Sequence, residues 1–154
     1  MKLRMFGVCE GVSYDLGAGV TIFRTIERVD VDRFPIEMSM TAFVTYDFER
    51  GEPFDILDEK KQFHLVVRGL FGERMIAVGH PRPLDFPDRQ HYSITDHHTV
   101  RLHIEEPEVV TFALKWGDGS VSEIRIPFDV AQEDDEALGR SAGRNIFVIR
   151  ETAF

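Results

Sequence analysis

The clearest pattern in the chain is an alternation of apolar and polar residues from position 36 to position 49. One parity is apolar throughout and consists of Ile36, Met38, Met40, Ala42, Val44, Tyr46 and Phe48. The other parity is polar, except for Phe43. Because side chains alternate between the two faces of a strand, this segment predicts one long strand with a buried face and a mostly solvated face.

Shorter runs repeat the same period of two along most of the chain. We expect further strands at residues 2–14, 19–29, 63–71, 75–80, 92–95, 100–104, 110–116, 124–130 and 145–150. Turn residues bound these runs. The sequence Gly117-Asp118-Gly119-Ser120 predicts a hairpin, because Gly and Asp tolerate the positive φ of a tight turn.

This spacing of short strands, without a long helical pattern, predicts an all-β fold. We expect an antiparallel β-sandwich of about eight strands, with a closed β-barrel or a jelly roll as the alternative. Residues 1–130 form the predicted sandwich domain. Residues 131–144 read equally well as an acidic linker or a short helix, and residues 145–154 as a C-terminal strand and tail.

Composition narrows the classes of partner. A chain of 154 residues has the usual length of one domain. Its 27 acidic and 18 basic residues give a net charge of −9, which disfavours binding to nucleic acid or to an anionic membrane. The single cysteine, Cys9, allows no internal disulfide and fits a buried, unreactive thiol. With no signal-like or membrane-length apolar run, we expect a cytoplasmic protein.

One group of segments resembles a known family. An N-terminal strand containing Cys9, a glycine-containing turn, the strand 20–23 and then Arg33-Phe34-Pro35 before the long strand follow in order. An acidic or glycine-rich hairpin and a final strand at 124–130 complete the pattern. This arrangement, over roughly residues 3–130, is similar to a family of small bacterial β-sandwich proteins classed as a domain of unknown function. The resemblance implies the fold and supplies no activity.

Five of the six histidines fall between positions 80 and 103. A metal site needs two to four such ligands that converge, usually with carboxylates. The candidate ligands are His80, His91, His97, His98 and Asp96. However, their spacing matches no zinc pattern, and adjacent residues on a strand point to opposite faces, so His97 and His98 are expected to diverge. By the same alternation, His103 is expected on a solvated face.

The sequence contains no Gly-x-Ser-x-Gly elbow and no glycine-rich phosphate loop, so we expect no catalytic residue and no cofactor. The favoured function is therefore a non-enzymatic binding or protein-interaction module. The expected partner is a second copy of the chain, forming a homodimer through the apolar segment Ile146, Phe147, Val148 and Ile149. The alternative is a small jelly-roll-like metal-dependent enzyme or metal-binding protein that uses the His-rich stretch at 80–103.

Overall fold

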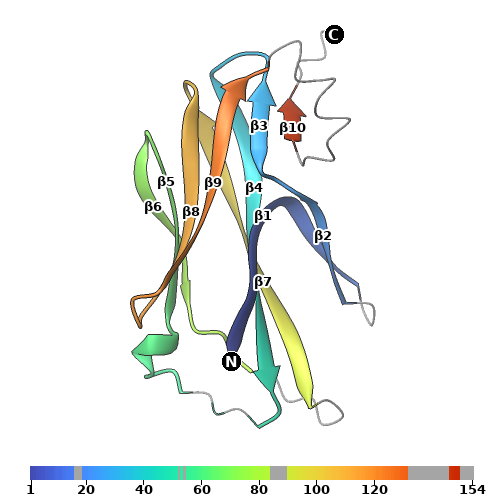
Figure 1. Ribbon diagram of the computed structural model, residues 1–154, viewed down its shortest axis with the longest axis vertical. Helices are drawn as coiled ribbons and strands as arrows, with labels where there is room; N and C mark the ends of the chain where they lie inside the picture. Colours follow the sequence, from blue (N-terminus) through green and yellow to red (C-terminus); the bar gives the residue numbers. More distant parts are fainter. Residues whose placement is uncertain (16–18, 52, 54, 84–89, 132–145, 150–154) are drawn as a thin grey trace.

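The computed structural model describes residues 1–15, 19–51, 53, 55–83, 90–131 and 146–149. Within these residues the chain forms ten strands, one 3-10 turn and no α-helix. The strands make two sheets that face one another (Figure 1). The predicted β-sandwich is therefore confirmed, and the two sheets do not close into a barrel.

The first sheet has four strands in the order β2-β1-β4-β7, all antiparallel. Their bounds are β1 Lys2–Asp15, β2 Gly19–Thr25, β4 Ile36–Glu49 and β7 His91–Ile104. The second sheet has six strands in the order β10-β3-β9-β8-β5-β6. Their bounds are β3 Arg28–Val31, β5 Phe63–Gly69, β6 Gly72–Gly79, β8 Glu108–Trp116, β9 Val121–Val130 and β10 Ile146–Ile149. The 3-10 turn η1 spans Glu59–Lys61.

Four of the predicted runs differ from the observed strands. The run expected at 19–29 divides into β2 and β3, because the chain leaves the first sheet at Ile26 and enters the second. There β3 lies beside β9 and β10 and runs parallel to both, so the second sheet is mixed. The runs expected at 92–95 and 100–104 are one strand, β7, because all of its 14 residues pair with β4. Phe71 was expected inside a strand and lies in the turn between β5 and β6.

The core lies between the sheets and follows the alternation of β4. Its even-numbered residues from Met40 to Phe48 are buried, and Val44 and Tyr46 are fully so. They face apolar positions of β8 and β9, of which Phe112 and Ile126 are also fully buried. The apolar parity predicted from the sequence of β4 is therefore the one that faces the core.

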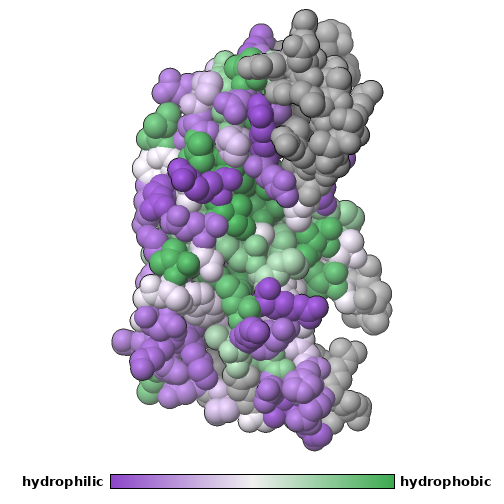
Figure 2. Space-filling view, viewed as in Figure 1, coloured by the Kyte–Doolittle hydropathy of each residue, from purple (hydrophilic) through white to green (hydrophobic). Residues whose placement is uncertain are grey.

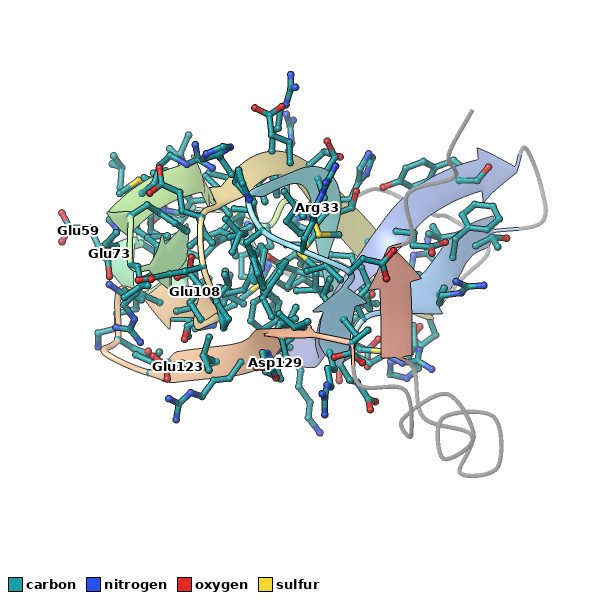
Figure 3. All side chains as sticks on the ribbon, turned by 90° about the horizontal axis from the view of Figure 1, so that it is seen from above. Arg33, Glu59, Glu73, Glu108, Glu123 and Asp129 are labelled. Carbon is teal, nitrogen blue, oxygen red and sulfur yellow. The ribbon has the colours of Figure 1, made fainter. Side chains whose placement is uncertain are left out.

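The sandwich has two sides along which strands of the two sheets come close without pairing. On one side β1 of the first sheet approaches β9 of the second, and Figure 2 shows hydrophobic side chains gathered in the middle of the face seen there. On the other side the edge strands β6 and β7 face each other. Seen from above, side chains fill the space between the sheets, and the hairpin of β1 and β2 curves away from them (Figure 3).

The outer face of the first sheet carries a second buried cluster. Phe43 lies on this face, yet it is only 1% exposed, and its ring lies against Gly7. Tyr14, at the far end of β1, reaches Thr95 and His97 on β7. Because β4 lies between β1 and β7, the hairpin must cross the outer face of β4 to make this contact.

We predict that Val44→Asp destabilises the fold by about 3 kcal/mol or more, because it buries a charge without a partner. Val44 is fully buried and directly opposite Asp96, so the new carboxylate also meets a like charge across the strands. Chemical denaturation measures the loss. Ser39→Asp is the control, because Ser39 is exposed on the same strand and opposite Arg101, and it should leave stability nearly unchanged. Equal stability of both variants would contradict the assigned faces.

We predict that Gly7→Ala destabilises the protein by about 1–3 kcal/mol, because a Cβ at Gly7 overlaps the Phe43 ring. Gly11→Ala on the same strand is the matched control, since a Cβ there meets nothing within 4 Å. Thermal unfolding of the two variants makes the comparison. If Gly11→Ala lowers the melting temperature as much as Gly7→Ala does, the contact between Gly7 and Phe43 is not the cause.

Candidate functional site

The adjacent histidines of β7 lie on opposite faces of their sheet. His97 pairs with Phe43 on the outer face, and His98 pairs with Ala42 on the inner face. This divergence is the one predicted from the alternation of a strand. The two imidazoles therefore cannot bind one metal ion in this arrangement.

The remaining histidines are spread along the molecule. His103 is exposed, as predicted, with its ring nitrogens 3.6 Å from Glu37 Oε1 and 3.8 Å from Glu105 Oε1. His91 begins β7 and is exposed, and His80 follows β6. In the part of the chain that the structure describes, no three His, Cys, Asp or Glu side chains could hold one metal ion together.

Asp96 and His98 are polar residues on the core-facing side of β7. They lie opposite Val44 and Ala42, which are fully buried. All other core-facing positions of this strand are apolar or aromatic, namely Tyr92, Ile94, Val100, Leu102 and Ile104. Asp96 and His98 are the two metal candidates that are neighbours on one face of the sheet. A protein zinc site uses three or four side chains, so this pair is too few for one.

A tyrosine hydroxyl faces the same interior. Tyr46 is fully buried, and its ring lies 6.2 Å from that of Phe63 and 5.9 Å from that of Trp116, between centroids. The Tyr46 hydroxyl and the Nε2 atom of His98 are both buried, and neither has a hydrogen-bond partner among the described residues. Buried polar atoms are usually hydrogen-bonded, so these two atoms are exceptions to that rule.

Burial governs the electrostatics of this cluster. It raises the pKa of the Asp96 carboxyl, although the nearby His98 and His97 oppose the shift. Burial lowers the pKa of His98, against the favourable effect of Asp96 on its charged form. Burial also raises the pKa of the Tyr46 hydroxyl, and the charge of Asp96 raises it further. The interior therefore disfavours charge on all three groups, so a charged Asp96 lowers the stability of the fold.

The outer face of β7 carries a tyrosine–histidine pair. The Tyr14 hydroxyl lies 2.7 Å from the Thr95 carbonyl oxygen and 2.8 Å from His97 Nδ1. A carbonyl oxygen only accepts, so the hydroxyl donates to Thr95 and accepts from the Nδ1–H of His97. This assigns the tautomer of neutral His97 and leaves its Nε2 as an acceptor. The pair holds the β1–β2 hairpin against the edge of β7.

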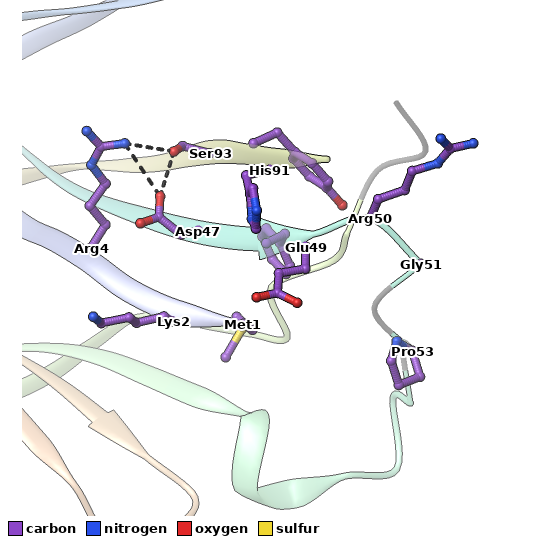
Figure 4. Close-up of a pocket in the computed structure, with 12 residues that line it drawn as sticks. Met1, Lys2, Arg4, Asp47, Glu49, Arg50, Gly51, Pro53, His91 and Ser93 are labelled. Carbon is purple, nitrogen blue, oxygen red and sulfur yellow. Dashed lines mark hydrogen bonds and ion pairs between the residues drawn. The ribbon is translucent and has the colours of Figure 1, made fainter. Parts of the chain in front are cut away.

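A cavity of about 920 Å³ opens at one end of the first sheet. Its lining residues include Arg4 of β1, Asp47 of β4 and Ser93 of β7. The Ser93 hydroxyl donates to Asp47 over 2.6 Å and accepts from Arg4 over 3.0 Å, and Figure 4 shows this network across the three strands. The side chains of Lys2 and Arg50 extend away from each other (Figure 4), so the cations do not converge on one anion.

Cys9 is fully buried, as predicted for an unreactive thiol. The single S–H of Cys9 has two carbonyl oxygens within reach, that of Gly11 at 3.2 Å and that of Thr41 at 3.5 Å from Sγ. Burial raises the pKa of this thiol, so the reactive thiolate is disfavoured.

The predicted interaction segment, Ile146 to Ile149, forms β10. Its backbone pairs in parallel with Arg28 to Val31 of β3 in the same chain. The sequence predicts docking of this strand on a second copy of the chain, and in the structure of the single chain it lies beside its own β3. The acidic segment at 132–144 lies outside the described residues.

The polar cluster on β7 was only partly visible in the sequence. Asp96 and His98 interrupt an apolar parity that runs from Tyr92 to Ile104, and this interruption made β7 look like two strands. The same interruption is the signal that could have identified a polar site on a core-facing surface. No sequence signal identifies Tyr46 as its third member, because Tyr46 continues the apolar parity of β4.

Comparison of the chain with models of known protein families and with curated proteins finds no match. Among the described residues, no helix is long and apolar enough to span a membrane.

We predict that Asp96→Asn stabilises the protein at neutral pH. The raised pKa means that the folded state binds this proton more tightly than the unfolded chain does. The resulting stability is complete below the ordinary Asp pKa and is lost as the pH rises through the raised value, whereas Asn does not ionise. A gain on the order of 1 kcal/mol raises the melting temperature by about 2–4 °C. Thermal unfolding between pH 3 and pH 8 tests this, and the difference should shrink at low pH.

Asp118→Asn is the contrasting control. The Ser120 hydroxyl and backbone N–H both donate to the Asp118 carboxylate and lower its pKa. The ionised Asp118 carboxylate stabilises the fold above the ordinary Asp pKa, and this stabilisation is lost as the pH falls through the lowered pKa. The Asn variant should therefore not gain stability at neutral pH. A stabilised Asp118→Asn would show that removing any carboxylate from this acidic chain suffices.

Proposed function

We propose that this protein is a non-enzymatic binding module that pairs with a second copy of itself by exchanging β10. The observation that carries the proposal is the position of β10 as the last strand of its sheet, where β3 is its one neighbour among the described strands. The ladder covers four residue pairs, from Ile146 with Arg28 to Ile149 with Val31. Such a short edge strand can be supplied by either of two identical chains.

Exchange preserves the backbone pairing. A β10 strand from a second copy meets the same β3 edge and forms the same parallel hydrogen bonds, as in domain swapping. Residues 131–145 connect β9 to β10. By length alone, a coil of this many residues can span roughly 20 Å. A reciprocal exchange gives a closed two-fold dimer.

The strand that pairs with β10 is buried in the folded chain. Val29 and Val31 on β3 are 0% and 1% exposed. Asp30 between them is buried as well, and Arg28 donates to its carboxylate over 2.7 Å. A β10 strand from a second copy would pair with this same stretch of β3. We place this module in the cytoplasm, where the unpaired Cys9 thiol stays reduced.

We predict that the full-length protein is a dimer at micromolar concentration and that truncation after Val130 makes it a folded monomer. Light scattering coupled to size exclusion gives the mass, and circular dichroism reports the retained strand content. Val148→Pro should weaken the dimer without truncation, because proline removes a backbone donor from the ladder. Thr152→Pro, beyond the strand, is the control. A monomeric full-length protein would leave β10 as a strand of its own chain and refute the exchange.

A further inference from the structure

The turn between β5 and β6 exposes two large apolar side chains at one end of the sandwich. Leu70 is 67% exposed and Phe71 is 45% exposed, and we call this pair the apolar tip. The ladder closes at Gly69 with Gly72, so the two residues form the whole loop. Gly72 supplies the positive φ of the turn, at 95°. The turn geometry therefore does not require large apolar side chains at this place.

Contacts with β8 hold the apolar tip. The Leu70 N–H donates to the Glu108 carboxylate, at the start of β8, over 2.6 Å. A Cβ at Gly69 would overlap both that carboxylate and the Phe71 ring, so the missing side chain lets these two groups pack together. The guanidinium carbon of Arg74 lies 6.0 Å from the centre of the Phe71 ring. These contacts tie the apolar tip to the start of β8.

A groove of about 290 Å³ lies between the apolar tip and the turn that joins β7 to β8. Its lining residues are Leu70 and Phe71 from the first turn, and His103, Glu105, Glu106 and Glu108 from the second turn and the strand ends beside it. The groove belongs to the end of the sandwich that is seen from above in Figure 3, where Glu108 is labelled. Among the described residues, its lining therefore combines an apolar surface with three carboxylates and no Lys or Arg.

The carboxylates of the second turn are available to a partner. Glu105 and Glu106 are both exposed. Within the described part of the chain, Glu106 has no ion-pair partner, and Glu105 meets only the His103 ring, whose Nε2 is 3.8 Å from its Oε1. Arg101, on the same strand as His103, is already paired with Glu37. The groove thus presents negative charge that the fold itself does not neutralise.

The shape of the groove favours a protein segment over a free small molecule. Pockets for small molecules usually have volumes of about 300–1,000 Å³ and enclose most of the ligand surface. This groove is at the lower limit, and Leu70 at its border is mostly exposed. A peptide chain can cover the leucine and the groove together. Contact with the apolar tip supplies affinity, and complementary charge selects the partner.

We propose that this groove binds a segment of a partner protein in which a Lys or Arg neighbours a large apolar side chain. The apolar side chain packs on Leu70 and Phe71, and the cation lies beside Glu105 and Glu106. Among the described strands, β10 is at the opposite edge of the second sheet from β6. Binding in the groove therefore does not depend on the exchange of β10.

The probe is an acetylated and amidated Ser-Arg-Phe-Arg-Ser peptide, added to the full-length protein at low ionic strength. NMR follows the backbone amide signals of Leu70, Phe71 and Glu106. We expect saturable shifts with a dissociation constant on the order of 0.1–1 mM, as suits a short peptide on a small surface. Two matched peptides separate the contributions: Ser-Glu-Phe-Glu-Ser reverses the charge, and Ser-Arg-Ser-Arg-Ser removes the apolar side chain. Each should bind at least about tenfold more weakly.

Variants of the protein test both halves of the groove. Leu70→Ser should weaken binding of the first peptide about tenfold, because it removes apolar contact area. The double change Glu105→Gln with Glu106→Gln should weaken it about fivefold, because two exposed charges are lost. All three side chains are exposed, so the variants should keep the fold, and the dispersion of the amide spectrum verifies this.

Controls remove the same groups elsewhere. Leu57→Ser, beside η1, and the double change Glu27→Gln with Glu59→Gln alter exposed residues outside the groove and should leave binding unchanged. Equal losses in these controls, equal binding of the charge-reversed peptide, or no saturable shift at Leu70 overturns the proposal. A lower mass of Leu70→Ser than of the unchanged protein in light scattering would place a second copy of the chain in the groove, and this result also overturns it.

Discussion

The antiparallel pairing of β4 with β7 sets the faces of the whole molecule. Fourteen residue pairs join these strands without a break, from Ile36 with Ile104 to Glu49 with His91. Because the side-chain period of a strand is two, a shift of one residue in this register would turn every core residue of β7 outward. The register therefore decides which side chains fill the core, and it also brings Asp96 and His98 inside.

The fold could be predicted because alternation is a local signal. The parity of β4 identified the buried face correctly, and the Gly117–Ser120 turn was recognised from its residues alone. The sheet order could not be predicted in this way, since it depends on which edges meet in space. The parallel placement of β3 beside β9 follows from a crossing between sheets at Ile26 that no local pattern encodes.

The polar cluster shows a second limit of local patterns. Asp96 and His98 occupy core-facing positions in the middle of β7 and interrupt its alternation of apolar and polar residues. The alternation was therefore weakest where these two residues lie. Such a conflict between the local pattern and the fold arises here because Asp96 and His98 occupy core-facing positions. By contrast, the divergence of His97 and His98 needed no tertiary information, because it follows from their adjacency.

The place of β3 in the second sheet also has a consequence for the order in which the chain folds. Val29 pairs with Phe128, so about a hundred residues separate two partners in this ladder. During synthesis β3 emerges long before β9, the strand with which it pairs. Folds built on such distant pairings close late and slowly, because the entropy of a long loop is lost before the contacts form. Until then Val29 and Val31, which are buried in the folded protein, have no core to pack against.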